Sequence, residues 1–128
     1  MAKIILAEDD SMTVEIYQKK FEEAGFEIIV ASTGKEALEC AKKEKADLML
    51  LDLVLPEIDG LSILKEIKKS GKYSELKIIV FSNLDSEEDK TKAFKYGADG
   101  FIPKTKHIPS ELVKEVKKIL KEGEKPFA

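Results

Sequence analysis

Six side chains with complementary chemistry stand where short apolar runs of the sequence end: Glu8, Asp9, Asp10, Asp52, Ser82 and Lys104. Carboxylates that converge on one crevice repel one another unless a cation lies among them, and oxygen-only ligands suit Mg²⁺. A carboxylate nucleophile, a metal ion, a hydroxyl donor and an ammonium group are what phosphoryl transfer to a carboxylate requires. In a chain with 37% charged residues, some acids fall at such positions by chance. Because the ends of four runs carry an acid, an acid, a hydroxyl and an amine, we favour a functional site over chance placement.

Five short apolar runs carry these groups at their ends, and each run is followed by a segment with helical periodicity. The runs predict strands at 4–7, 26–31, 47–52, 77–82 and 100–102. The periodic segments predict helices at 11–24, 34–44, 61–69, 87–96 and 110–121. The middle runs are apolar at consecutive positions, which is typical of strands covered on both faces. The alternation predicts an α/β fold, a doubly wound (βα)5 unit with a five-stranded parallel sheet, whose ligands bind beyond the carboxyl ends of the strands.

Composition indicates a compact globular protein. Its 128 residues and 43% hydrophobic content suffice for one domain, which we assign to 1–122, followed by a C-terminal tail at 123–128. A single cysteine, Cys40, cannot form an internal disulfide, and no apolar run is long enough to span a bilayer. We therefore expect a cytoplasmic protein without membrane contact. The net charge is −3, all 22 basic residues are lysine and the charges are interleaved, which disfavours direct nucleic-acid binding.

Two longer motifs carry a resemblance to a known family. The segment DLMLLDLVLPEIDG at 47–60 contains Asp52 followed by Pro, Asp and Gly at the family's spacing, and GADGFIPK at 97–104 ends in Lys104. An acidic pair also ends the first predicted strand, and a serine ends the fourth. Over residues 3–120 the chain therefore resembles the receiver domain of two-component response regulators, of the single-domain, CheY-like kind. The resemblance implies a flavodoxin-like sheet with strand order 2-1-3-4-5.

The resemblance also implies a role for each site residue. Asp52 is the phosphoacceptor, and Ser82 and Lys104 bind the phosphoryl oxygens. The implied ligands of Mg²⁺, or of Mn²⁺ in its place, are Glu8, Asp9, Asp52 and the backbone carbonyl of Val54. Family members receive the phosphoryl group from a sensor histidine kinase, a phosphotransfer protein or a small acyl phosphate. Their catalysis is limited to their own phosphorylation and dephosphorylation, so we do not expect an enzyme in the usual sense.

In the family, phosphorylation switches the face formed by the fourth helix, the fifth strand and the fifth helix. Ser82 moves toward the phosphoryl group, and the aromatic residue at Phe101 turns inward into the space left behind. The resemblance thus implies a downstream protein target at this face, with the chain acting as a monomer or a phosphorylation-dependent dimer. The first helix, with Glu15, Tyr17 and Gln18 near the crevice, is where the family usually docks its kinase, so we expect the partner there.

Several positions depart from the family pattern. Thr105 stands where a cis-linked proline is common, Asn83 replaces a small residue beside the phosphoryl pocket, and Phe101 lacks the hydroxyl of the commoner tyrosine. Val54 and Leu84 flank the site by family position. Because both are apolar, they should order water poorly, which predicts slow loss of the phosphoryl group.

Two other functions compete with a phosphorylated switch. A binding module of the same fold, for which phosphorylation no longer matters, is motivated by Asn83 and Thr105. A Mg²⁺ phosphohydrolase with Asp52 as covalent nucleophile is disfavoured, because such enzymes typically want a second acid two residues on, where Val54 stands. The lone histidine, His107, is interpreted as an exposed loop residue and not as a phosphotransfer group.

Overall fold

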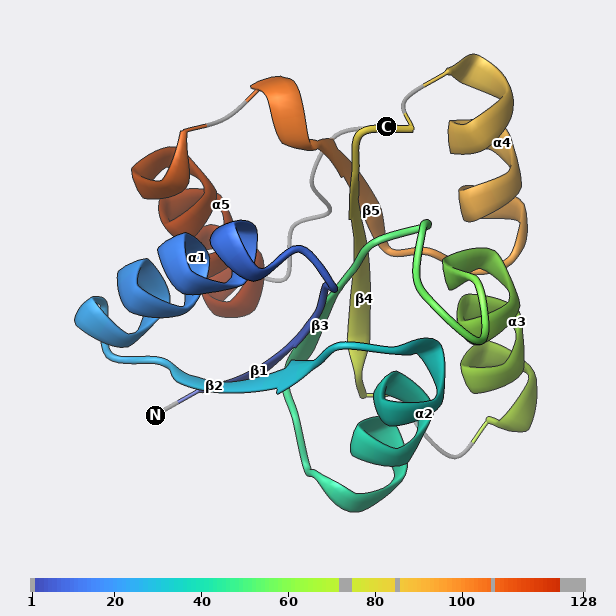
Figure 1. Cartoon of the computed structure of the whole chain (residues 1–128), viewed down its shortest axis with the longest axis horizontal. Helices are drawn as coiled ribbons and strands as arrows, with labels where there is room; N and C mark the ends of the chain where they lie inside the picture. Colours follow the sequence, from blue (N-terminus) through green and yellow to red (C-terminus); the bar gives the residue numbers. More distant parts are fainter. Residues whose placement is uncertain (1, 72–74, 85, 107, 123–128) are drawn as a thin grey trace.

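The computed structural model describes residues 2–71, 75–84, 86–106 and 108–122, which form five successive strand–helix units (Figure 1). The strands are β1 (Lys3–Ala7), β2 (Glu27–Ala31), β3 (Leu48–Leu51), β4 (Lys77–Ser82) and β5 (Gly100–Pro103). The helices are α1 (Ser11–Glu23), α2 (Gly34–Lys43), α3 (Gly60–Ser70), α4 (Glu87–Lys95) and α5 (Pro109–Glu122), with a 3₁₀ turn η1 (Lys104–Lys106) after β5. The predicted elements are confirmed, with ends displaced by no more than one residue. The interpretations of His107 and of the tail at 123–128 lie outside the described residues.

The five strands form one parallel sheet in the order β2-β1-β3-β4-β5. The chain runs from β1 outward to β2 and then crosses to β3 on the other side of β1, so the order reverses between β1 and β3. Ala7 at the end of β1 pairs with Leu51 at the end of β3. The residues that follow these two strands are therefore neighbours at the reversal point, where ligands bind in open α/β sheets.

Helices cover both faces of the sheet, with α1 and α5 on one side and α2, α3 and α4 on the other (Figure 1). Each strand contributes to both layers. In β1, Ile4 and Leu6 pack on the side of α1 and α5, while Ile5 and Ala7 pack on the opposite side. All four are buried. This burial on both faces explains why the strands are apolar at consecutive positions. Within the described part of the chain, no helix is both long and apolar enough to cross a membrane.

Tyr17 of α1 belongs to the core. Its side chain is 8% exposed, and its ring meets that of Phe81 in β4 edge to face, with the centroids 5.1 Å apart. The helical period of α1 places Tyr17 with Phe21 on the buried stripe, so Tyr17 offers little surface to a docking partner. Glu15 is exposed and Gln18 is half-buried, so their part in docking stays a prediction.

Candidate functional site

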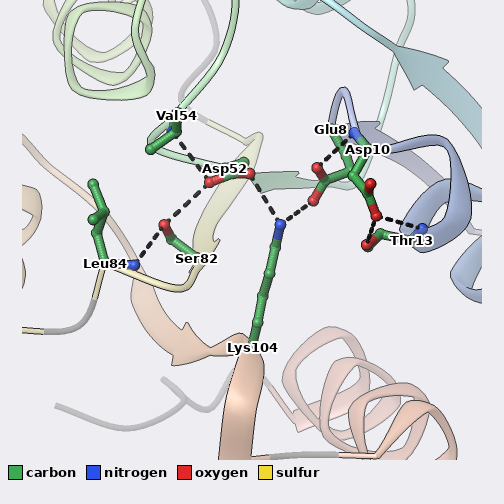
Figure 2. Close-up of polar contacts among 8 residues, drawn as sticks. All are labelled: Glu8, Asp10, Thr13, Asp52, Val54, Ser82, Leu84 and Lys104. Atoms are coloured by element: carbon green, nitrogen blue, oxygen red, sulfur yellow. Dashed lines mark hydrogen bonds and ion pairs between the residues drawn. The ribbon is translucent and has the colours of Figure 1, made fainter.

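Asp52 lies at the carboxyl edge of the sheet, directly after β3. Its backbone N–H donates to the carbonyl oxygen of Ala7 at 3.1 Å, which ties it to the end of β1. Its Oδ1 atom accepts hydrogen bonds from the Ser82 hydroxyl and the Val54 backbone N–H, each at 3.1 Å (Figure 2). Its Oδ2 atom accepts from the Lys104 ammonium at 3.0 Å. Both carboxylate oxygens are therefore held in a fixed orientation by groups from three different strand ends.

Three carboxylates gather within reach of a single cation. One oxygen from each of Glu8, Asp9 and Asp52 lies within 4.8 Å of the others. Glu8 is 1% exposed, whereas Asp9 is exposed, so one donor is buried and another faces solvent. The Oε1 atom of Glu8 is buried, and its partner is the Lys104 ammonium. Oxygen donors from carboxylates, one group buried and another open to water, fit Mg²⁺, which binds few protein ligands and keeps several waters.

Lys104 is the internal counter-charge of this cluster. It follows β5 directly, and its ammonium forms ion pairs with both Glu8 and Asp52 (Figure 2). Burial by itself lowers the pKa of Lys104, but its contacts with the two carboxylates outweigh burial and leave the pKa above its usual value. Burial also raises the pKa of Glu8, and the Lys104 ammonium opposes that shift only in part. Lys104 thus keeps its positive charge beside carboxylates that are partly removed from water.

Ser82 links Asp52 to the segment that follows β4. Its side chain is fully buried, and its hydroxyl donates to Asp52 Oδ1 while accepting the backbone N–H of Leu84 at 3.1 Å (Figure 2). Asn83 and Leu84 are themselves exposed. Any group that displaces the Ser82 hydroxyl from Asp52 therefore also disturbs the start of the β4–α4 connection.

Asp10 lies outside the group of three carboxylates that could hold a metal ion, and its side chain belongs to helix α1. Its side chain caps α1 by accepting the Thr13 hydroxyl and, at 3.0 Å, the Thr13 backbone N–H. Both bonds lower the pKa of Asp10, and the hydrogen bond from the Thr13 hydroxyl has the larger effect. Its own N–H donates to Glu8 Oε2 at 3.0 Å (Figure 2). Thr13 was not predicted as part of this arrangement, although an Asp directly before a predicted helix start is a common N-cap residue.

Phe101 lies inward in β5. It is 1% exposed and packs in the core layer that contains Val80 and Ala93. In this structure the Phe101 ring thus already has the inward position that the resemblance implies for the switched state. The movement of the ring on phosphorylation stays a prediction. Thr105 lies in the η1 turn, and no peptide bond among the described residues is cis, so the chain leaves Lys104 through a trans bond.

The chain matches the family model for the response regulator receiver domain over residues 4–117. It is 34% identical over 122 residues to the alkaline phosphatase synthesis transcriptional regulatory protein PhoP of Bacillus subtilis, which covers 95% of this chain and 50% of PhoP. The chain therefore spans about half the length of that relative.

Solved structures agree with the family model. The receiver domain of the Francisella response regulator 1452 is 32% identical, with a TM-score of 0.87, covering 97% of this chain and 100% of the other. The receiver domain of DrrB, described as BeF3-activated, is 28% identical with a TM-score of 0.81, covering 94% of this chain and 97% of the other. DrrB is a Thermotoga maritima protein. Together with the strand order and the acidic cluster, these matches show that the chain belongs to the response regulator receiver domain family.

Proposed function

We propose that Asp52 accepts a phosphoryl group in a Mg²⁺-dependent reaction and that the phosphorylated chain signals by binding another protein. The observation that carries the proposal is the set of groups on the Asp52 carboxylate: the Ser82 hydroxyl, the Lys104 ammonium and two neighbouring carboxylates. The solved relative DrrB is described as BeF3-activated, which supports an activated form of this fold. Receiver domains are signalling modules, and catalysis here is limited to the chain's own phosphorylation and dephosphorylation.

The chemistry follows from the positions of the side chains. A carboxylate oxygen of Asp52 attacks the phosphorus of a phosphohistidine or an acyl phosphate. The new O–P bond forms as the bond from phosphorus to the donor breaks, and the leaving group departs with that electron pair. Ser82 and Lys104 are placed to donate hydrogen bonds to the phosphoryl oxygens. Glu8, Asp9, Asp52 and the Val54 carbonyl would hold Mg²⁺, which supplies positive charge to the transferred group when bound.

We propose that a sensor histidine kinase or a phosphotransfer protein donates the phosphoryl group and that another protein is the downstream target. We also propose that this signalling takes place in the cytoplasm. Ser82 couples Asp52 to the backbone of Leu84, just before α4, so phosphorylation would first disturb the β4–α4 connection. Phe101 in β5 packs against the same side of the sheet as α4. The face of α4, β5 and α5 is thus the proposed output surface, used by a monomer or a phosphorylation-dependent dimer without direct nucleic-acid contact.

Incubation with acetyl phosphate and Mg²⁺ tests the proposal directly. We expect the intact mass to increase by one phosphoryl group, and Asp52→Asn to remove the gain entirely, since an amide is not a nucleophile for phosphorus. Omission of Mg²⁺ should abolish or strongly slow the gain. If the mass stays unchanged while calorimetry shows that Mg²⁺ binds, the phosphoacceptor function is refuted.

The second candidate is a binding module for which phosphorylation is irrelevant. It is favoured by Asn83, which is exposed immediately after Ser82 where the family usually has a small residue. This candidate requires that a partner bind equally well to the untreated protein, the acetyl phosphate-treated protein and Asp52→Asn. A phosphohydrolase remains disfavoured, because the exposed Val54 stands where a second acid is needed.

We predict that the phosphorylated protein loses its phosphoryl group slowly. The side chains of Val54 and Leu84 are 57% and 44% exposed, and the backbone N–H of each bonds to a site side chain, so apolar groups flank Asp52 (Figure 2). Exchange of either for Asn should speed hydrolysis about tenfold, a modest part of what an aligned base contributes. The mass is followed after the donor is removed. Ile108→Asn, at an exposed apolar residue outside the site, should leave the rate unchanged.

A further inference from the structure

The ring of Phe81 lies beneath the Lys104 ammonium. The Lys104 Nζ atom is 5.7 Å from the centroid of the Phe81 ring and lies over its face. A cation within about 6 Å of a ring face is attracted by the negative charge of the π system, and the attraction grows as the cation loses water. The Lys104 side chain is only 14% exposed, so this contact is largely shielded from solvent.

Phe81 is itself firmly placed. It is 1% exposed in β4, and the edge-to-face contact with Tyr17 of α1 orients the two rings. Side chains alternate along a strand, so Phe81 and the following Ser82 point to opposite faces of the sheet. Ser82 reaches the Asp52 carboxylate on one side, whereas Phe81 packs with α1 and α5 on the other. Successive residues of β4 thus contact two different groups of the site.

The ring contact differs in kind from the other contacts of Lys104. Its ion-pair partners, Glu8 and Asp52, are the carboxylates that the proposed function assigns to Mg²⁺ and to the phosphoryl group. When those carboxylates are engaged, the ion pairs weaken, but the ring of Phe81 remains in place. A long lysine side chain without that surface would sample many conformations.

We propose that Phe81 is a positioning residue that holds the Lys104 ammonium over the carboxylates of the site. This rests on the proposed function, because the consequence of the positioning is faster phosphoryl transfer to Asp52. Phe81 touches neither Asp52 nor the donor and acts through Lys104. The property required is the aromatic face, so an apolar side chain of similar size cannot replace it.

The kinetic test compares Phe81→Leu with Phe21→Leu. Phe21 is 0% exposed in the same core layer and meets Phe26 edge to face, so both variants remove a fully buried aromatic ring. We expect Phe81→Leu to slow phosphorylation by acetyl phosphate about fivefold and Phe21→Leu to leave the rate unchanged. Thermal unfolding of both variants confirms that each is folded. In a Lys104→Met background, Phe81→Leu should cause no further slowing.

Proton NMR provides a readout that does not depend on phosphorylation. The ring current of Phe81 should shift the Lys104 ε-methylene signal upfield of the other lysines; this signal is identified by its loss in Lys104→Met. The shift should disappear in Phe81→Leu and persist in Phe21→Leu. The proposal is overturned if the wild-type signal is unshifted, or if Phe81→Leu slows phosphorylation equally in the Lys104→Met background. If the wild type shows the shift but gains no phosphoryl group, the positioning role stands and the proposed function fails.

Discussion

We expect Lys104→Met to lower the free energy of unfolding near neutral pH by about 3 kcal/mol, a loss typical of removing one partner from a buried ion pair. Glu8 is 1% exposed and loses the counter-charge that its buried Oε1 contacts, and Asp52 loses a hydrogen bond. Methionine keeps an unbranched apolar side chain over Phe81, so the packing changes little. Urea unfolding without divalent ions measures the loss.

The deficit of Lys104→Met relative to the wild type should shrink as the pH falls. Burial raises the pKa of Glu8 above 4.5, and the variant removes the ammonium that opposes this shift, so the pKa rises further. A carboxyl with a raised pKa binds its proton more tightly in the folded state. Its contribution to stability therefore falls as the pH rises from 4.5 through the folded pKa, and is recovered on acidification. Urea unfolding repeated at a series of pH values from 4.5 upward shows the trend.

Added Mg²⁺ should restore part of the stability lost in Lys104→Met, because an ion bound only by the folded state stabilises it. Lys68→Met is the matched control, since Lys68 pairs with Asp99 at 2.9 Å in a more exposed position away from the site. That control should lose less stability and show no response to Mg²⁺. A deficit in Lys104→Met that is independent of both pH and Mg²⁺ would show that Lys104 does not neutralise the acidic cluster.

We expect Gly60→Ala to lower the free energy of unfolding by about 2 to 3 kcal/mol, the upper range for overpacking a filled site. A Cβ atom at Gly60 would lie 2.3 Å from the carbonyl oxygen of Asp52 and 2.6 Å from the Cα of Leu53. Both are backbone atoms, so the chain itself must shift. The Gly60 N–H also donates to the Leu53 carbonyl at 3.0 Å, which fixes the close approach. Phosphorylation of Asp52 should therefore slow more than tenfold, because small misplacements of a reacting group are costly.

Gly34→Ala separates displacement of Asp52 from general loss of stability. A Cβ atom at Gly34 would lie 2.1 Å from the carbonyl oxygen of Ile58, so it collides with the same β3–α3 connection at a point away from Asp52. Both variants should unfold at lower urea concentration, but Gly60→Ala should show the larger loss of phosphorylation rate in folded protein. Equal rates in the two variants would mean that Gly60 contributes to stability alone.

Much of the fold was predictable because its determinants are local. Consecutive apolar residues such as those of β3 indicate strands buried on both faces, and helical periodicity marks the segments between them. The sheet order agrees with the order that the family resemblance implied. Tyr17 shows the limit of local reasoning, since its place on the buried stripe of α1 was visible but its contact with Phe81 in a distant strand was not.

The amino-acid sequence is enough to identify the chemical groups at the strand ends, because parallel strands bring their carboxyl ends to one edge of the sheet. Glu8, Asp52, Ser82 and Lys104 were therefore predictable as neighbours. Which atoms meet depends on the folded chain: Lys104 bridges Glu8 and Asp52, Asp10 caps α1, and Phe101 lies inward. Such choices depend on strand register, side-chain rotamers and the exclusion of water by packing, which join residues far apart in the chain and leave no local pattern in the sequence.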